Sequence, residues 1–228
     1  MSYLGDVSNH GYPSVLAAVR SEAEDIIRKK KLNDSKIIRY VKTVNATLIN
    51  SFIKLYVYEN AINDDTCDAL KSIVTKNMID SSIPNCRQSK SAVFSITDRL
   101  IHTVNAQISG MIGIDSDDLE GVQGVHYENN GFYNAHSDYF EHNEPNVSSR
   151  TGTKIMTVRL YLEDLMPENN GELEFPIISY SIKPAKGMLV FWENVSYGVP
   201  SIASVHNDRQ ITGATNTYLV NHVREHFF

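Results

Sequence analysis

Apolar residues recur every three to four positions through the first half of the chain, which is the spacing of amphipathic helices. Pro13 stands at a first helical position, with acidic residues ahead of basic ones, and Asn33 and Ser35 offer oxygens that cap a second helix. Asn63 precedes a third, capped helix. The pattern predicts helices over residues 13–28, 36–44, 63–74 and 97–112.

From residue 121 onward the pattern changes to short β-rich runs that alternate with turns. One alternating run also comes earlier, just before the third helix. This density of short strands predicts a sandwich or barrel, so a helical first third and a strand-rich remainder place the chain in the α+β class. The predicted strands cover residues 53–58, 122–128, 154–162, 172–175, 178–182, 188–192, 201–206 and 215–223.

Composition narrows the class of protein. With 228 residues, 42% of them hydrophobic, the chain can bury one sizeable core. No apolar run approaches the length of a membrane span and the first residues lack a secretory signal, so we expect a cytoplasmic protein. A formal charge of -6 argues against binding to nucleic acid. Cys67 and Cys86 have no metal-ligand spacing, and we expect two reduced thiols.

The candidate chemistry begins with His136 and Asp138, which are two residues apart near the end of a strand-like run. Residues i and i+2 of a strand face the same side, so both side chains can bind one metal ion. Two histidines and one carboxylate on one face of an octahedron are the ligand set of non-haem Fe(II) oxygenases. His206 is the candidate for the second histidine.

The residues around this pair resemble those of a known family. Tyr127, Gly131 and Tyr133 precede His136 in the order strand, tyrosine, glycine turn, tyrosine, His-x-Asp. That order resembles the core of the prolyl 4-hydroxylase family of 2-oxoglutarate-dependent oxygenases. Further matches follow in the family's order over residues 157–164, 171–176 and 183–192, and then at His206 and Gly213. The resemblance covers roughly residues 53 to 223.

The resemblance implies a fold and a domain division. The fold is a double-stranded β-helix, a jelly-roll-like, cupin-type barrel buttressed by N-terminal helices, with a metal near its mouth. Residues 53–228 form the oxygenase domain, and residues 1–52 form a helical N-terminal extension. We expect the extension to pack on the barrel; alternatively it pairs with another subunit or shapes the substrate entrance. Residues 143–152 are either a lid over the substrate or an idle surface loop.

Other histidines compete with His206 for the remaining ligand position. In the family a glycine follows the distal ligand, and Gly213 stands seven residues after His206. His222 is the second choice, because it follows that glycine near the end of the last predicted strand. The histidines that we do not favour as ligands are His10, His102, His126, His142 and His226.

The resemblance also implies the cofactors: Fe(II), with 2-oxoglutarate and O2 as cosubstrates and ascorbate in a supporting role. In the family, 2-oxoglutarate is decarboxylated to succinate and CO2. A lysine or arginine nine residues after the distal histidine pairs with the distal carboxylate of 2-oxoglutarate. Here that position is Thr215, which cannot neutralise a carboxylate.

Arg159 is our candidate replacement for the missing cation. Period-two alternation puts Thr157, Arg159 and Tyr161 on one face of a strand that, by the resemblance, lines the cosubstrate pocket. A guanidinium matches a carboxylate with paired donors. We therefore expect Arg159 to hold the distal carboxylate, with Thr215, Tyr127 and Tyr161 as hydroxyl donors. The alternative is that Arg159 faces solvent or pairs with a nearby acid, and weaker cationic candidates are Arg209 and Lys154.

The sequence thus predicts an Fe(II)- and 2-oxoglutarate-dependent dioxygenase that hydroxylates an unactivated C–H bond. The resemblance favours a prolyl residue of a peptide or protein as substrate. A free amino acid or other small metabolite is the close alternative, and a catalytically silent ligand- or protein-binding barrel is the alternative of another class. Tyr133, Tyr139 and Trp192 either contact substrate or pack. The sequence carries no signal of oligomeric state.

Overall fold

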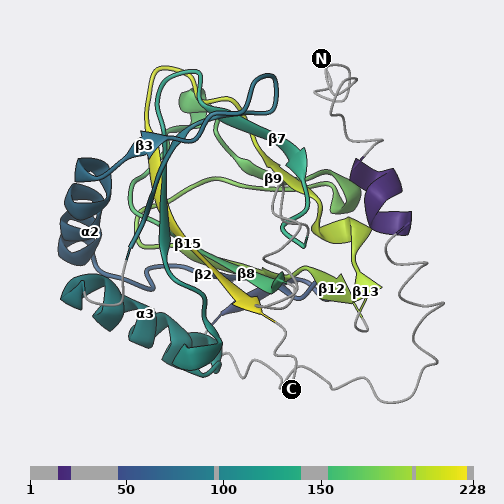
Figure 1. Cartoon of the computed structure of the whole chain (residues 1–228), viewed down its shortest axis with the longest axis horizontal. Helices are drawn as coiled ribbons and strands as arrows, with labels where there is room; N and C mark the ends of the chain where they lie inside the picture. The colour runs from purple at the N-terminus through teal and green to yellow at the C-terminus, as the bar shows by residue number, and fades with distance from the viewer. Residues whose placement is uncertain (1–14, 22–45, 95–97, 140–153, 197–198, 225–228) are drawn as a thin grey trace.

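Two antiparallel β-sheets face each other in the computed structural model, and two helices cover the larger one (Figure 1). The structure describes residues 15–21, 46–94, 98–139, 154–196 and 199–224. The larger sheet has eight strands, the smaller has five, and two further strands form a short ribbon. This is the α+β double-stranded β-helix that the sequence predicts.

Eight strands make up the larger sheet: β1 Thr47–Asn50, β2 Leu55–Tyr58, β3 Ile79–Asp80, β5 Lys90–Val93, β6 Gln123–Tyr127, β8 Lys154–Tyr161, β11 Leu189–Glu193 and β15 Asn216–Arg224. Their order is β1-β2-β11-β8-β15-β6-β5-β3. The long strands β8 and β15 are neighbours near the centre, where Tyr218 lies opposite Tyr161 and Val220 lies opposite Arg159.

Five shorter strands make up the smaller sheet: β4 Arg87–Gln88, β7 Phe132–His136, β9 Leu173–Phe175, β10 Tyr180–Ile182 and β14 His206–Asp208. Their order is β10-β9-β14-β7-β4. On β14 and β7, His206 lies opposite His136, and a register irregularity brings Asp208 opposite Tyr133. Tyr133 in turn lies opposite Arg87 on β4. The ribbon pairs β12 Val195–Ser196 with β13 Val199–Pro200.

The helices α2 Asp64–Lys76 and α3 Arg99–Ile112 begin at side-chain caps that their sequences supply. The Asn63 side chain accepts a 2.9 Å hydrogen bond from the backbone N–H of Thr66, and Asp98 caps α3 in the same way. Gly113 ends α3 in the left-handed conformation. Both helices lie on the side of the molecule away from β7 and β9 (Figure 1).

Side-chain alternation along β15 separates two cores. Leu219 and Val223 face α2 and α3 in the outer core, whereas Tyr218 and Val220 face the space between the sheets. The inner core is rich in aromatic side chains, among them the fully buried Trp192. The direction in which alternate residues of β15 point therefore determines which of its side chains reach the barrel interior.

A tight backbone contact joins the turn before β11 to the segment before α2. Gly187 has φ +75° and accepts hydrogen bonds from the N–H groups of Ala61 and Ile62. A Cβ added at Gly187 would lie 2.2 Å from the carbonyl oxygen of Ile62. Only glycine satisfies both the backbone conformation and the contact.

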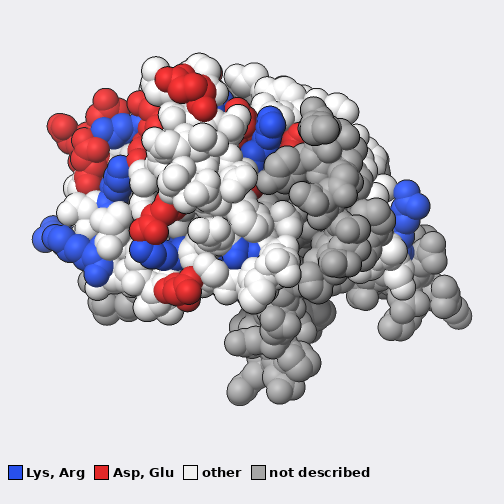
Figure 2. All heavy atoms as spheres, turned by 90° about the horizontal axis from the view of Figure 1, so that it is seen from above, with Lys and Arg blue, Asp and Glu red and all other residues white. Residues whose placement is uncertain are grey.

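The outer surface carries charges of both signs. Figure 2 shows Lys and Arg side chains interspersed with Asp and Glu side chains on the visible face. Ion pairs such as Lys71–Glu163 at 2.6 Å and Lys186–Asp68 at 2.7 Å join α2 to the loops beside it. None of the helices in the described ranges is both long and apolar enough to cross a membrane.

Several predicted elements have different bounds or fall outside the described residues. Residues 15–21 are helical, but the rest of the predicted helix 13–28, the helix 36–44 and the loop 143–152 lie outside the described ranges. β1 belongs to the larger sheet, so residues 47–50 are not part of a helical extension, because they pair with β2. The predicted strand 201–206 is instead a 3-10 turn, Ile202–Ser204, followed by β14. Strands β1, β3, β4, β5, β12 and β13 were not predicted.

Candidate metal centre and its pocket

Three predicted ligand residues meet between the two sheets. His136 ends β7, His206 begins β14, and Asp138 follows β7 by two residues. One ligand atom from each side chain lies within 4.8 Å of the other two. Oδ1 of Asp138 is 3.4 Å from Nε2 of His136, and Oδ2 is 3.6 Å from Nε2 of His206. The antiparallel register of β7 and β14 therefore brings together residues that are far apart in sequence.

Both imidazoles are oriented by the backbone. Nδ1 of His136 donates a 2.9 Å hydrogen bond to the carbonyl of Asn134, and Nδ1 of His206 donates one of 2.9 Å to the carbonyl of Ser204. Each Nε2 is then left with its lone pair toward Asp138. Nε2 of His206 is buried and has no hydrogen-bond partner in the described part of the chain. A buried nitrogen without a partner is costly unless a ligand binds it.

The protonation states of the cluster also suit a metal. Burial lowers the pKa of His206 to about 4, so its imidazole is neutral at physiological pH. Although burial acts to raise the pKa of Asp138, the neighbouring His206, His136 and His222 hold it well below its usual value. Neutral imidazoles and an ionised carboxylate are the forms that bind a metal cation. The residues present therefore fit Fe(II).

A second set of side chains holds the ligands in place; Thr157 and Trp192 come from the larger sheet, Asn194 follows its strand β11, and Tyr133 comes from β7 of the smaller sheet. The Thr157 hydroxyl on β8 donates a 2.7 Å hydrogen bond to Oδ2 of Asp138, and Nδ2 of Asn194 donates one of 2.9 Å to Oγ1 of Thr157. Tyr133 stacks on His136 with ring centroids 3.6 Å apart, and the Trp192 ring lies edge-on to His206 at 4.8 Å. These contacts restrict the rotation of the ligands.

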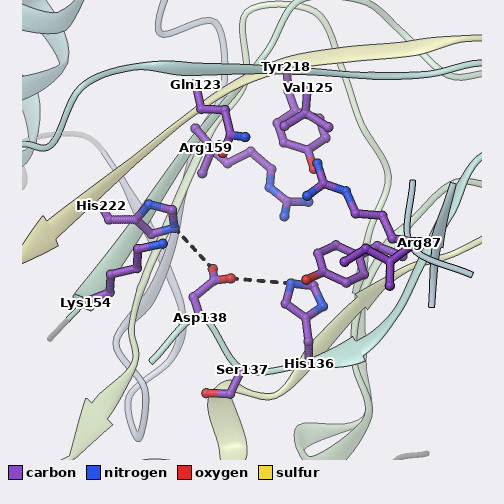
Figure 3. A pocket seen from close by; sticks show the side chains of 13 residues that line it. Arg87, Gln123, Val125, His136, Ser137, Asp138, Lys154, Arg159, Tyr218 and His222 are labelled. Atoms are coloured by element: carbon purple, nitrogen blue, oxygen red, sulfur yellow. Dashed lines mark ion pairs between the residues drawn. The ribbon is translucent and has the colours of Figure 1, made fainter. Parts of the chain in front are cut away.

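The cluster opens into a cavity of about 420 Å³ between the sheets (Figure 3). Cationic side chains outnumber acidic ones in its wall, in contrast to the mixed outer surface. The lining residues are Ile83, Arg87, Gln123, Val125, Tyr133, His136, Ser137, Asp138, Lys154, Arg159, Tyr218, Val220 and His222.

Arg159 reaches this cavity, as predicted, but it already has an acidic partner. Its Nη1 donates to Oδ1 of Asp208, and both side chains are buried. The Tyr127 hydroxyl donates a 2.8 Å hydrogen bond to the other oxygen of Asp208, and Tyr218 donates one of 3.3 Å. The alternative that Arg159 pairs with a nearby acid thus describes the structure. Nε of Arg159 has no partner among the described residues.

The prediction that Thr215 donates to the cosubstrate is wrong for the geometry observed. Its hydroxyl donates a 2.9 Å hydrogen bond to Glu163, which pairs with Lys71 of α2. Thr215 precedes β15 and points to the helix side, as Leu219 does, while Asn216 and Tyr218 are buried on the opposite side. The spacing of nine residues from the distal histidine does not indicate which face of the sheet Thr215 occupies.

The remaining predicted site residues differ in what they contact and in whether they line the cavity. Thr157 contacts the ligand Asp138 and Tyr127 contacts Asp208, so neither hydroxyl is free. Tyr161 is fully buried beside Arg159, and burial raises its pKa to about 12. Trp192 is fully buried in the inner core and does not line the cavity. Tyr139 lies in the turn after the ligands and is not among the cavity-lining residues.

His222 lies in the cavity, although it is outside the three-residue cluster. Its Nε2 is 3.7 Å from Oδ2 of Asp138 (Figure 3). Its Nδ1 is 3.4 Å from Oε2 of Glu120. His222 therefore contacts a ligand from the side of the larger sheet, whereas His206 occupies the third ligand position in the geometry.

Sequence reasoning missed two charged residues of the site. Asp208 stands two residues after His206 on β14, so the alternation rule applied to His136 and Asp138 would have found it. Arg87 comes from the two-residue strand β4, which has no periodicity to detect. We found no sequence signal that marks Arg87.

Comparison with known proteins agrees with this geometry. Residues 122–219 match the family model described as the 2OG-Fe(II) oxygenase superfamily. A probable prolyl 4-hydroxylase 3 of Arabidopsis thaliana is 30% identical over 136 residues, which cover 54% of this chain and 45% of that protein. The chain spans about half the length of the curated plant relatives it matches.

Two solved structures show a similar fold. The viral collagen prolyl hydroxylase of Paramecium Bursaria Chlorella virus-1, solved with 2OG, has a TM-score of 0.64 and 18% identity, over 75% of this chain and 96% of that one. A prolyl-4-hydroxylase of Pseudomonas putida has a TM-score of 0.58 and 14% identity, over 93% of this chain and 100% of that one. At these identities the likeness concerns the fold.

Proposed function

We propose that this chain, whose residues 122–219 match the model of the 2OG-Fe(II) oxygenase superfamily, is an Fe(II)- and 2-oxoglutarate-dependent hydroxylase. The single observation that carries the proposal is the cluster of His136, Asp138 and His206, in which Nε2 of His206 is buried without a partner in the described residues. His136 and His206 would hold the metal through Nε2, and Asp138 through its carboxylate.

Iron at this centre, with 2-oxoglutarate and O2 as cosubstrates, supplies the oxidising power for C–H hydroxylation while 2-oxoglutarate becomes succinate and CO2. The chain contributes position and shielding. Thr157 and Asn194 fix the carboxylate of Asp138, and the carbonyls of Asn134 and Ser204 fix the imidazoles. Trp192 covers His206 from the interior, which keeps bulk water away from the ligand. A supporting role for ascorbate stays a prediction.

We propose a prolyl residue of a peptide or protein as the substrate, because the plant relative and both solved neighbours are named prolyl hydroxylases. A free amino acid or other small metabolite is the competing substrate class. The two classes differ in size, so a proline-rich peptide and free proline or other amino acids, offered separately, distinguish them.

A second candidate function is a barrel that binds a ligand or protein without turnover. One observation favours it: Asp208 already pairs with Arg159 where the distal carboxylate of the cosubstrate was expected. If that pair fills the cosubstrate site, metal binds but 2-oxoglutarate does not.

The deciding experiment is an anaerobic titration of the purified protein with Fe(II) and then with 2-oxoglutarate. A chelated iron and 2-oxo acid complex gives a visible charge-transfer absorption, which we expect to saturate in the wild type and to be absent in His206→Ala. His102→Ala is the matched control, because His102 is an exposed histidine on α3. It should titrate as the wild type does.

Turnover is then measured as succinate formed in the presence of O2 and each substrate class. Saturable absorption followed by substrate-dependent succinate supports the hydroxylase. Iron binding with no absorption at millimolar 2-oxoglutarate would overturn it and support the silent barrel.

A further inference from the structure

We propose that Arg87 is the cation that binds the distal carboxylate of 2-oxoglutarate in this pocket. The inference rests on the proposed function. Thr215 has no positive charge to offer, and the charge of Arg159 is already paired with Asp208, so another cation is needed. Arg87 lies on β4, outside the segment that matches the superfamily model.

Two arginines line the cavity, and in the described part of the chain only one of them has a carboxylate at ion-pair distance. The cavity wall includes Arg87 and Arg159, and the carboxylate of Asp208 pairs with Arg159. Arg87 has no carboxylate within ion-pair distance in the described part of the chain; its Nε donates a 2.5 Å hydrogen bond to the Ser89 hydroxyl. The outward edge of its guanidinium therefore remains available for an anion.

The register of the smaller sheet places Arg87 beside the same side chains that surround Arg159. Asp208, Tyr133 and Arg87 form a row across β14, β7 and β4. The guanidinium carbon of Arg87 lies 5.0 Å from the centroid of the Tyr133 ring, and that ring stacks on His136. Figure 3 shows Arg87 and Arg159 extending into the cavity on the same side of His136 and Asp138.

This arrangement suits a five-carbon diacid. One aromatic ring separates the Arg87 guanidinium from a metal ligand, so a cosubstrate chelated at the metal by its 2-oxo acid end would direct its other carboxylate along the Tyr133 ring. A buried carboxylate needs a cation and hydrogen-bond donors to offset its loss of hydration. The planar, paired donors of Arg87 supply both. Arg159 keeps its position through Asp208 and completes the wall.

The test compares two ligands that differ only at the distal end: 2-oxoglutarate, and 2-oxopentanoate, which has the same five-carbon chain without the second carboxylate. Each is titrated anaerobically against the Fe(II)-loaded protein, with the charge-transfer absorption as readout. In Arg87→Met we expect the apparent Kd for 2-oxoglutarate to rise about tenfold or more, with no change for 2-oxopentanoate. Arg87→Lys, which keeps the charge, should restore part of the affinity.

Lys90→Met is the matched control, because Lys90 lies on β5, the next strand along the chain but in the other sheet, and pairs with Glu128 at the exposed surface. It should bind both ligands as the wild type does. If Arg87→Met weakens both ligands equally, Arg87 maintains the shape of the pocket and the proposal is wrong. The proposal is also wrong if Arg87→Met binds 2-oxoglutarate with the same apparent Kd as the wild type.

These outcomes are separate from the failure of the proposed function. If the wild type gives no absorption with either 2-oxo acid, the hydroxylase proposal fails together with this one. If the wild type gives the absorption and prefers 2-oxoglutarate, the hydroxylase proposal stands. The variants then test only whether Arg87 is the residue that binds the distal carboxylate.

Discussion

Arg159 and Asp208 form an ion pair in the barrel interior, where each side chain is 4% exposed. The two tyrosine hydroxyls on the other oxygen of Asp208 complete its hydrogen bonds. A buried pair of this kind is weak evidence of net stabilisation, but removing one partner leaves an uncompensated charge. The pair therefore controls both the stability of the barrel and the charge that a cosubstrate encounters.

Asp208→Asn should lower stability and raise the affinity for 2-oxoglutarate. The unpaired Arg159 costs about 3 kcal/mol of unfolding free energy, while a second free guanidinium attracts the distal carboxylate. Arg159→Leu, which leaves Asp208 to oppose that carboxylate, should change the affinity in the other direction. Thermal unfolding without ligand and the anaerobic titration measure the two effects. Equal or weaker binding of 2-oxoglutarate by Asp208→Asn would contradict the prediction.

The metal-free protein should lose stability as the pH falls from about 6.5 to about 4. Burial lowers the pKa of His206 from 6.5 to about 4, so in this window the unfolded chain binds a proton that the folded chain does not. The loss is on the order of 3 kcal/mol for the full shift. Urea unfolding across this range measures the slope, and His206→Gln should flatten it. If His206→Gln shows the same dependence of unfolding free energy on pH as the wild type, groups other than His206 cause the loss of stability.

Thr157→Val should weaken metal binding while the fold is retained. Valine keeps the branched shape of threonine but cannot donate to Asp138, whose carboxylate then loses a fixed orientation. Loss of such an outer contact raises the dissociation constant for a metal by about tenfold or more. Anaerobic competition with a chromophoric chelator measures it. Thr75→Val, the same substitution on the exposed side of α2, should leave Fe(II) affinity unchanged.

Gly187→Ala should destabilise the barrel by about 1–3 kcal/mol, the usual cost of a strained backbone position. Its positive φ disfavours alanine, and the new Cβ would lie 2.2 Å from the backbone oxygen of Ile62. Gly110→Ala is the contrasting control, because Gly110 is exposed within α3 and has nothing within 4 Å of an added Cβ. That change should stabilise by up to about 1 kcal/mol. Urea midpoints that move together in both variants would exclude the backbone explanation.

His206 is far from the other two metal ligands in the sequence and was identified by the family spacing; the structure brings all three together. The signal of His136 and Asp138 is local, because they stand two residues apart at the end of a strand-like run. The helices α2 and α3 were predictable for the same reason, since their caps and periodic apolar positions lie within each segment.

The cosubstrate end of the pocket was not predictable, because it depends on register. Thr215 has the right spacing but points to the helix side of the larger sheet, and Arg87 arrives from a strand of two residues. Local sequence does not determine which face of a sheet a strand residue occupies, or which residues of the two sheets come into contact. The cytoplasmic location, the choice between a lid and an idle loop for residues 143–152, and the packing of residues 1–52 on the barrel stay predictions.

The metal ligands come from the smaller sheet, while the residues that orient Asp138 come from the larger one. Because Thr157 of the larger sheet orients a ligand of the smaller one, a metal binds more tightly when the two sheets are docked, and this affinity adds to the stability of the docked form. Iron at one hundred times its dissociation constant would add about 2.7 kcal/mol. Resistance of this chain to unfolding and proteolysis should therefore follow the supply of iron, even when no substrate is present.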